Sequence, residues 1–248
     1  MQPQISGFCP ICERQVTFQM SKPDFYRSLQ CSECQSGPRQ RALWFALNRF
    51  RPKWRELSVH ESSPGWDLVS RRLTAECKNY TASQYDPNLS PGEIVDGTRL
   101  PCKKYIVQNL ERQTFADESF DLVVTQDVFE HIFDPFKAIA EIARTLRPGG
   151  ATIMSVPVVR KFNPSQRRAR LTGDGAIEFI LSAEYHGNPV SGDGALVTVD
   201  WGYDIAALLA RASGLWFIMQ TFENMDYGIR DECNQILIGM KSPLPTLE

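Results

Sequence analysis

From residue 57 onward, segments with the composition of buried strands alternate with segments of helical periodicity. The clearest strand is residues 120–126, a run rich in Leu and Val. The clearest helix begins at Asp134-Pro135, an N-cap followed by proline at the first helical position. Strands separated by helices pair in parallel through crossover connections, so we expect an α/β fold. Further strands are expected at residues 57–61, 79–85, 105–108 and 151–156, and a further helix at residues 66–77.

The C-terminal part of the chain departs from this alternation. A helix is expected over residues 204–213, ended by Gly214, and strands are expected over residues 215–222 and 234–240. The polar link between those two strands is about eleven residues long, too short for a crossover helix, so they should form an antiparallel pair. Residues 158–201 show weak periodicity and are expected to be a functional insertion.

Four cysteines near the N-terminus have the spacing C-x2-C-x18-C-x2-C. Each pair can present two thiolates from one turn, and two pairs complete the shell of a structural Zn²⁺ ion. Disulfide bonds between them are the alternative, which export from the cell would favour. The zinc-ribbon module should span residues 1–38, with short strands at 15–19 and 26–29, and a connecting helix should follow over residues 39–56. The expected ligands are Cys9, Cys12, Cys31 and Cys34.

Composition and charge suit a globular protein with a hydrophobic core. The net charge is −2 and 42% of the residues are hydrophobic, so a polyanion partner is not implied for the whole chain. No apolar run approaches the ~20 residues that span a bilayer, and the first residues lack the features of a signal peptide. We therefore expect a cytoplasmic protein with no membrane partner. The helix after the zinc module is locally basic, which leaves open either a solvated face or a contact with RNA.

Three motifs follow one another in the second half of the chain. A buried strand opens with Phe120-Asp121, the pair Glu130-His131 comes after it, and the next helix ends in the run Leu146–Gly150, which reads Leu-Arg-Pro-Gly-Gly. As a set they make residues 57–241 resemble the class I S-adenosylmethionine-dependent methyltransferases of the type 11 group. The resemblance implies a Rossmann-like, mostly parallel seven-stranded sheet with an antiparallel C-terminal strand, in a methyltransferase domain over residues 57–248.

The resemblance also implies a binding site for S-adenosyl-L-methionine at the carboxyl ends of the strands. Three residues depart from the family's pattern. Ser63 stands where the family has glycine, Gln84 where it has an acidic residue for the ribose, and Asn109 where it often has Asp beside the adenine. Amide groups keep hydrogen-bonding capacity but carry no charge. The cofactor-binding residues implied are Glu61, Ser63, Gly65, Gln84, Tyr85, Asn109, Leu110, Gln126, Asp127 and Phe129.

Methyl transfer to an oxygen nucleophile needs a base, and histidine suits this role near neutral pH. His131 follows the fourth strand, near the expected methyl group, and either acts directly or only shapes its loop. His186 and Tyr185 lie in the insertion, where we expect them to face the transferred methyl group as catalytic residues. His60 is expected to be buried structure, and Asp204 to cap the following helix.

The expected function is methylation of a small molecule or sugar on oxygen or nitrogen. A basic cluster in the insertion could attract an anionic acceptor such as a phosphorylated or nucleotide-linked sugar, or could simply be a solvated lid. Two other functions stay open, an RNA base methyltransferase guided by the zinc module and a non-catalytic interaction protein that keeps a degenerate cofactor fold. The basic cluster comprises Arg160, Lys161, Arg167, Arg168 and Arg170.

Overall fold

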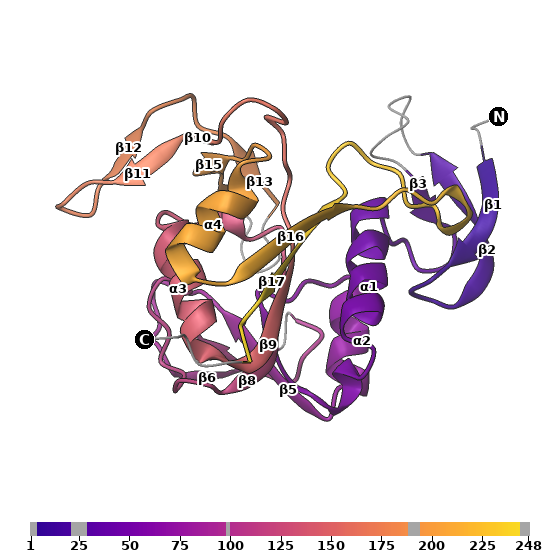
Figure 1. Cartoon of the computed structure of the whole chain (residues 1–248), viewed down its shortest axis with the longest axis horizontal. Coiled ribbons are helices and arrows are strands. Elements are labelled where there is room, and N and C mark those ends of the chain that lie inside the picture. The colour runs from indigo at the N-terminus through magenta and orange to yellow at the C-terminus, as the bar shows by residue number, and fades with distance from the viewer. Residues whose placement is uncertain (1–3, 21–28, 98–99, 188–193, 244–248) are drawn as a thin grey trace.

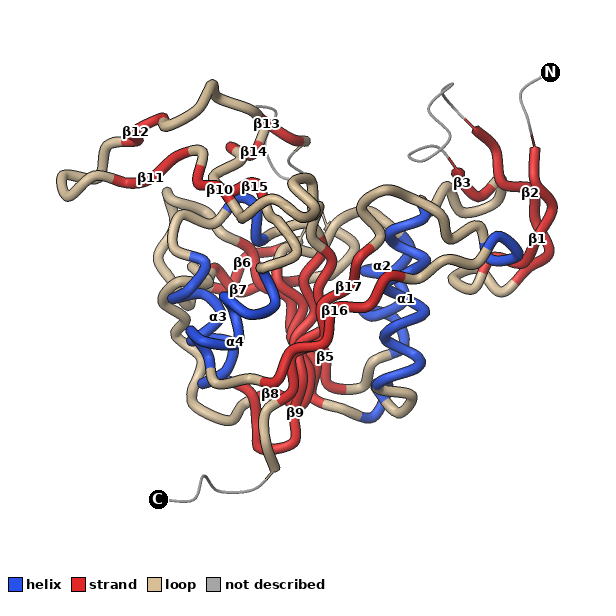
Figure 2. Tube along the Cα trace, turned by 45° about the horizontal axis from the view of Figure 1, so that its top comes forward, coloured by secondary structure: helices blue, strands red, loops and turns tan. Residues whose placement is uncertain are grey.

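A central sheet with helices against both faces forms the larger part of the molecule (Figures 1 and 2). The computed structural model describes residues 4–20, 29–97, 100–187 and 194–243. Among these residues the sheet has eight strands in the order β16-β17-β9-β8-β4-β5-β7-β6. The strand bounds are β4 Ser58–Ser62, β5 Asn79–Gln84, β6 Ile94–Asp96, β7 Lys104–Val107, β8 Phe120–Gln126, β9 Leu146–Ser155, β16 Trp216–Thr221 and β17 Gln235–Met240.

The helices form two layers, one on each side of the sheet. Helices α1 and α2 lie against one face, and α3 and α4 lie against the other (Figure 2). None of the helices in the described ranges has the length and apolar character that a bilayer-spanning segment requires. The helix bounds are α1 Pro38–Phe50, α2 Leu68–Glu76, α3 Pro135–Thr145 and α4 Ile205–Ser213.

The middle of the sheet is parallel, as the alternation of strands and helices predicts. β4 pairs in parallel with both β5 and β8, and β8 pairs in parallel with β9. On β8, Leu122, Val123 and Val124 are all buried, although consecutive side chains point to opposite faces. A strand covered on both faces is what an unbroken apolar run indicates in a parallel sheet. The Rossmann-like α/β fold inferred from the sequence is therefore confirmed.

Both edges of the sheet are antiparallel. β17 lies antiparallel between β9 and β16, as expected for the C-terminal strands. At the other edge, β6 pairs antiparallel with β7, so the described sheet has eight strands where seven were expected. β6 is three residues long, and Ile94 and Asp96 are both exposed. The sequence of β6 therefore has no alternation of apolar and polar residues from which the strand could be predicted.

Capping side chains set where the helices begin. Asp67 accepts hydrogen bonds from two backbone N–H groups at the start of α2, and Asp134 does the same for one at the start of α3. The expectation for Asp204 was wrong in its chemistry. It occupies the N-cap position of α4, but its carboxylate accepts hydrogen bonds from the backbone N–H and the hydroxyl of Ser165 instead. Gly214 ends α4 in the left-handed conformation, with φ 71°.

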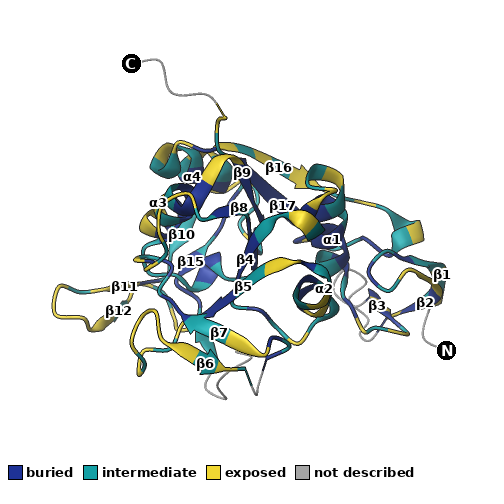
Figure 3. Ribbon diagram, turned by 90° about the horizontal axis from the view of Figure 1, so that it is seen from below, coloured by how far each residue is buried: buried dark blue, intermediate teal, exposed yellow. Residues whose placement is uncertain are grey.

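The N-terminal module is a three-stranded antiparallel sheet that lies beyond α1 (Figures 1 and 3). The strand expected at residues 15–19 is present as part of β2, whereas most of the one expected at residues 26–29 lies outside the described residues. The bounds are β1 Gln4–Cys9, β2 Arg14–Met20 and β3 Leu29–Cys31.

One buried cluster joins this module to the large sheet. Phe18 of β2 and Val59 of β4 belong to it, and both are fully buried. The guanidinium of Arg41 on α1 is also buried, and it donates hydrogen bonds to the carbonyl oxygens of Leu29 at 2.5 Å and Gly228 at 2.7 Å. Module, helix and C-terminal loop are therefore packed as one unit. The sequence predicted a separate zinc-ribbon module over residues 1–38, but unfolding of that module alone would expose this cluster.

The insertion folds as three short antiparallel pairs, β10 with β15, β11 with β12 and β13 with β14. The hairpin of β11 and β12 extends away from the rest of the molecule and is largely exposed (Figures 1 and 3). The bounds are β10 Gln166–Arg167, β11 Ala169–Leu171, β12 Ile177–Phe179, β13 Tyr185–His186, β14 Ala195–Leu196 and β15 Val199–Asp200.

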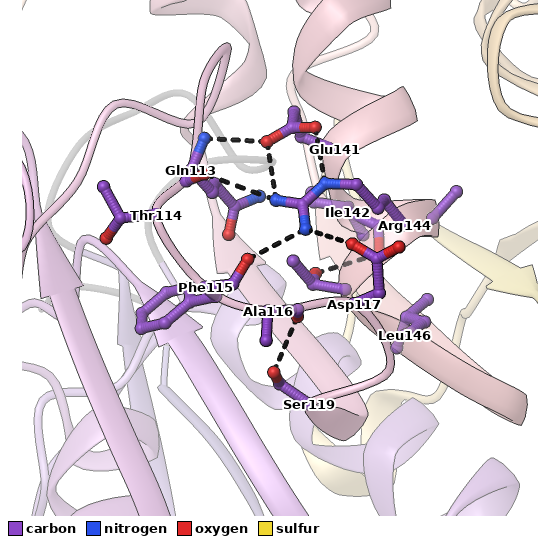
Figure 4. Close-up of polar contacts among 12 residues, drawn as sticks. Gln113, Thr114, Phe115, Ala116, Asp117, Ser119, Glu141, Ile142, Arg144 and Leu146 are labelled. Atoms are coloured by element: carbon purple, nitrogen blue, oxygen red, sulfur yellow. Dashed lines mark hydrogen bonds and ion pairs between the residues drawn. The ribbon is translucent and has the colours of Figure 1, made fainter.

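Arg144 near the end of α3 holds the loop that follows β7 (Figure 4). Its guanidinium donates to the Phe115 carbonyl at 2.8 Å, to the Asp117 carboxylate at 2.6 Å and to the Glu141 carboxylate at 2.8 Å. Glu141 also accepts a hydrogen bond from the backbone N–H of Gln113 at 2.8 Å. The hydrogen bond from Arg144 lowers the pKa of Glu141, so this carboxyl is ionised at neutral pH. The network fixes a loop that begins at the expected cofactor site.

Replacing Arg144 with alanine should lower the free energy of unfolding by about 2 kcal/mol, because several partly buried acceptors lose charge-assisted hydrogen bonds. Urea unfolding followed by circular dichroism measures this. Arg170→Ala is the matched control, since it removes an ion pair of 2.8 Å with Glu178 on the exposed hairpin. The control should change the free energy of unfolding by less than about 0.5 kcal/mol. Equal effects of the two variants would contradict a structural role for the Arg144 network.

Candidate functional site

A cavity of about 760 Å³ opens at the carboxyl ends of the parallel strands. Its walls come from the residues that directly follow β4, β5, β7 and β8, with one side chain from the end of β9. β4 lies between β5 and β8, so the chain changes direction across the sheet at this point. Open α/β sheets bind their ligands at such a point. Of the expected cofactor residues, the cavity is lined by Ser63, Gly65, Gln84, Tyr85, Asn109, Leu110, Gln126 and Asp127.

The turn after β4 holds Ser63 in a conformation that glycine adopts more easily. Its φ is 56°, in the left-handed region. Its backbone N–H donates to the Ser83 carbonyl at 2.8 Å, which ties the turn to β5. Ser63 therefore adopts the backbone conformation that a glycine would adopt here, and this conformation costs free energy for a residue with a side chain.

Ser63→Gly should raise the free energy of unfolding by about 0.5–1 kcal/mol, since relief of the left-handed strain exceeds the entropy that glycine adds to the unfolded chain. Ser62→Gly is the control, because Ser62 is buried in β4 and is not among the positive-φ residues. The control should destabilise the protein by about 1 kcal/mol. Urea unfolding curves, fitted with one common m-value, give the change in free energy of unfolding for both variants. If Ser63→Gly is less stable than the wild type, the serine side chain is needed at this position.

Glu61 and Phe129 do not line the cavity. Glu61 is completely buried and accepts hydrogen bonds from the hydroxyls of Ser70 at 2.6 Å and Tyr80 at 2.7 Å. It also accepts one from Gln126 Nε2 at 3.0 Å, and so positions a side chain that does line the cavity. Burial, with the nearby carboxylate of Asp67, raises the pKa of Glu61 to about 7. Phe129 is completely buried in the core under α3.

The two amide side chains differ in what they offer a ligand. Gln84 is 7% exposed, and its Oε1 has no hydrogen-bond partner within the described residues. A buried amide oxygen left unpaired at the wall of a cavity can accept a hydrogen bond from a ligand hydroxyl. Asn109 Oδ1 already accepts from the backbone N–H of Glu111 at 2.9 Å. Asn109 therefore keeps its amide donor, but not the free acceptor that two-sided pairing with adenine would use.

Arg39 brings a positive charge to the cavity that was not assigned to the site from the sequence. Its guanidinium lies 3.1 Å from the carboxylate of Asp127, and both residues line the cavity. Asp127 has φ 51° and accepts a hydrogen bond from the hydroxyl of Ser155 at 2.9 Å. The basic character of the helix that begins here was visible in the sequence. The sequence did not show that Arg39, the first arginine of that helix, lies at the cavity in the folded chain.

His131 and His186 come together, although they belong to different parts of the chain. Their ring centroids are 5.2 Å apart and the rings are nearly perpendicular. His131 lines the cavity, and its Nδ1 lies 2.9 Å from the carbonyl oxygen of Leu196. Burial lowers the pKa of His131, so the ring is neutral at physiological pH and its Nε2 keeps a free lone pair. Neither His186, whose side chain is 40% exposed, nor the adjacent Tyr185, which is 55% exposed, lines the cavity, so the expectation that both face the transferred methyl group is not met by the cavity wall.

His60 is structural, as expected. It is completely buried, its Nε2 lies 2.8 Å from the Ser83 hydroxyl, and its ring stacks on Phe120. Burial lowers the pKa of His60 to about 3, so it stays neutral at physiological pH.

The basic cluster of the insertion is largely occupied by contacts within the protein. Arg168 forms ion pairs with Asp200 at 2.7 Å and Glu184 at 3.2 Å, and Arg170 pairs with Glu178. Arg160, Arg167 and Lys161 donate hydrogen bonds to a glutamine side chain or to backbone carbonyl oxygens. Paired guanidinium groups attract an anion less than free ones.

The four N-terminal cysteines form one compact group of sulfur atoms. Cys9 Sγ and Cys34 Sγ are 3.7 Å apart, and Cys12 Sγ and Cys31 Sγ are 3.8 Å apart. A disulfide would hold two sulfur atoms about 2 Å apart, so the structure contains thiols rather than these bonds. Four thiolates at about 2.3 Å from a tetrahedral zinc ion lie about 3.8 Å from one another. The spacing of the sulfur atoms therefore fits zinc.

Comparison with known proteins agrees with this geometry. Residues 61–154 match the type 11 family described as a methyltransferase domain, which confirms the resemblance seen in the sequence. An uncharacterized methyltransferase of Mycobacterium sp. (strain KMS) is 28% identical over 119 residues, 47% of this chain. A probable S-adenosylmethionine-dependent methyltransferase of Mycolicibacterium smegmatis is 38% identical over 58 residues, 23% of each chain. The match with the first of these spans 44% of that relative's length.

Solved structures share the fold over most of the chain. An S-adenosylmethionine-dependent methyltransferase from Mesorhizobium loti superposes with a TM-score of 0.54 at 14% identity, covering 81% of this chain and 98% of its own. The 1,6-didemethyltoxoflavin-N1-methyltransferase of Burkholderia thailandensis, solved with 1,6-didemethyltoxoflavin and S-adenosylhomocysteine, has a TM-score of 0.50 at 13% identity. It covers 83% of this chain and 78% of its own. At these identities the likeness concerns the fold.

Proposed function

We propose that the chain is an S-adenosyl-L-methionine-dependent methyltransferase that acts on a small molecule or sugar, at oxygen or nitrogen. The observation that carries the proposal is the cavity at the carboxyl ends of the strands, with the unpaired, buried Oε1 of Gln84 in its wall. A nucleoside ribose offers hydroxyl donors for this atom. The family match over residues 61–154 supports the same assignment.

The cofactor would supply an activated methyl group, so the protein's main task is alignment. Gln84 and the turn at Ser63 would hold the ribose and the chain next to it, and Asn109 and Leu110 would lie beside the base. Gln126 and Asp127 would face the end of the cofactor that reacts. His131, neutral and with a free Nε2, is suited to take a proton from the acceptor.

The acceptor should enter from the side of the insertion. Leu171, Gly175, Gly187 and Ala195 of this segment line the same cavity as the expected cofactor residues. Two of the cationic side chains of the insertion, Arg168 and Arg170, are paired with carboxylates, and the other three donate hydrogen bonds to neutral oxygen atoms, so an anionic acceptor would have to compete for them. A neutral hydroxyl or amine of a small molecule or sugar fits this wall better.

The RNA alternative is weakened but keeps part of its support, because several basic side chains of this stretch are engaged within the protein whereas Arg49 and Lys53 are exposed. In the basic helix and its extension, Arg41 is buried, Arg39 pairs with Asp127 and Arg55 pairs with Glu76 at 2.6 Å. A nucleic-acid surface needs cationic side chains that are free to reach phosphates. No specific observation favours the non-catalytic alternative either.

We further propose that Cys9, Cys12, Cys31 and Cys34 hold one zinc ion as a structural centre. Four protein thiolates leave no open coordination position, so the metal would contribute to folding rather than to chemistry. Two of the four, Cys9 and Cys31, are completely buried among the residues of the shared cluster.

Calorimetric titration with S-adenosylhomocysteine tests the cofactor assignment. Wild-type protein should bind one equivalent. Gly65→Trp should weaken binding by about 100-fold or more, because Gly65 lines the cavity and a side chain there also displaces the Asp67 carboxylate, which a Cβ would meet at 2.9 Å. Gly173→Trp is the control, since a side chain there meets no atom within 4 Å and the residue lies on the exposed hairpin. Absence of binding to wild-type protein would overturn the proposed function.

A further inference from the structure

Glu130 is a buried carboxylate without a compensating hydrogen bond. The residue is 1% exposed, and neither Oε1 nor Oε2 has a hydrogen-bond partner within the described part of the chain. Its Oε1 instead faces two imidazole nitrogens, His131 Nε2 at 3.7 Å and His186 Nδ1 at 4.0 Å. These distances are too long for hydrogen bonds. An uncompensated buried carboxylate is costly, and a proton on it would be an O–H donor with no acceptor in reach.

The outer nitrogens of both rings already have partners. His131 Nδ1 lies 2.9 Å from the Leu196 carbonyl oxygen, which makes it the N–H donor and leaves the Nε2 lone pair directed at Glu130. His186 Nε2 lies 3.5 Å from the Glu184 carboxylate, which leaves Nδ1 on the side of Glu130. Histidines that bind metals typically show this arrangement, with one nitrogen on the metal and the other held by a carbonyl or carboxylate oxygen.

We propose that Glu130, His131 and His186 form a binding site for one divalent transition-metal ion. One ligand atom from each residue lies within 4.8 Å of the other two. Two imidazoles and one carboxylate are the ligand set of open sites for zinc, manganese or iron. An ion about 2.1 Å from each atom would bring tetrahedral ligands to about 3.4 Å from one another. The separations of the Glu130 oxygen from the two nitrogens, 3.7 and 4.0 Å, therefore need to shorten by about 0.3 and 0.6 Å, and the separation of the two nitrogens, which is at most 4.8 Å, by up to about 1.4 Å.

His186 is the ligand that can move most easily to shorten these separations. Glu130 and His131 are held in a 3-10 turn, Phe129–His131, whose backbone is tied to the insertion through the hydrogen bond from Thr198 N–H to the Glu130 carbonyl at 2.7 Å. His186 lies on the two-residue strand β13, and its side chain is 40% exposed. A small shift of that strand closes the site.

The position of the site gives the ion a role in the proposed reaction. His131 lines the cavity, so a ligand position left open on the ion would face the acceptor. A divalent ion lowers the pKa of a bound hydroxyl, which favours its reaction as a nucleophile. This role rests on the proposed methyltransferase function, whereas binding of the metal does not.

Titration with Mn²⁺ tests the site in the full-length protein loaded with one equivalent of Zn²⁺, which the four thiolates bind in preference to a site of two imidazoles and one carboxylate. Thiolates are poor ligands for Mn²⁺, so the four-cysteine centre does not compete. Electron paramagnetic resonance of free Mn²⁺ should show one saturable equivalent per chain in the wild type. Glu130→Gln and His186→Asn should each weaken binding by about 30-fold or more, and Glu184→Gln by about 10-fold. Glu178→Gln, an exposed carboxylate on the hairpin of the same insertion, should leave the affinity within twofold.

Two results would overturn the metal site. One is the absence of saturable Mn²⁺ binding to the wild type, and the other is unchanged affinity in His186→Asn, a partly exposed position at which substitution leaves the core intact. S-adenosylhomocysteine titrations of the same proteins separate the two proposals. Mn²⁺ binding without cofactor binding would retain the metal site and reject the methyltransferase function, and the reverse result would reject only the metal site.

Discussion

Replacing Cys31 with serine should abolish zinc binding and unfold the whole chain rather than its first 38 residues. A structural zinc ion contributes about 10 kcal/mol to the folding of small zinc modules, as much as the whole stability of an ordinary domain. Cys31 belongs to the buried cluster that includes Phe18 of the module and Val59 and Leu122 of the large sheet. Loss of the module would expose one side of that cluster to water and would also remove the Leu29 carbonyl, one of the acceptors of Arg41.

Far-UV circular dichroism, with zinc content measured by mass spectrometry, tests this expectation. The variant should lose both zinc and most of its regular secondary structure. Cys102→Ser is the control, because Cys102 is buried in a separate small cluster beside β5 and should keep zinc and fold. A zinc-free Cys31→Ser protein with an intact sheet would instead show that the module folds independently, as its sequence alone suggested.

The sheet could be predicted because its strands carry their own signals. β8 is an apolar run that only burial on both faces explains, and the helices beside it begin at recognisable caps. β6 could not be predicted, since three residues without alternation pair only because β7 offers a free edge. The packing of Arg41 was equally hidden. Its charge suggested a solvated face, but the folded chain surrounds it with carbonyl oxygens from distant segments.

The sequence predicted the site residues that lie at the ends of strands. It did not predict the ones that reach the site through packing between distant segments. Gln84 and Gln126 are the last residues of β5 and β8, so parallel pairing through β4 brings them to one edge of the sheet. Arg39 reaches the cavity only because α1 packs across the sheet. Glu130 was visible as half of a Glu-His motif. Its chemistry depends on His186, which the insertion folds back against it.

His186 could act either as a base or as a metal ligand. Both roles predict a loss of turnover when His186 is replaced. As a base, His186 would take the acceptor's proton, and its loss would cost about 100-fold. As a ligand, it would hold the ion that activates the acceptor, with a loss of similar size. Neither role involves binding of the cofactor, because the expected cofactor residues line the cavity and His186 does not.

His186→Asn is therefore expected to lower turnover by about 100-fold or more while the affinity for S-adenosylhomocysteine stays within twofold. The reaction is followed with the acceptor that supports turnover in the wild type, and cofactor affinity is measured by calorimetry. Tyr185→Phe is the neighbouring control, and turnover should change by less than about threefold, because this exposed side chain does not belong to the group of Glu130, His131 and His186. If turnover of His186→Asn is unchanged, His186 has no part in the mechanism, and His131, whose neutral ring lines the cavity, remains as the base.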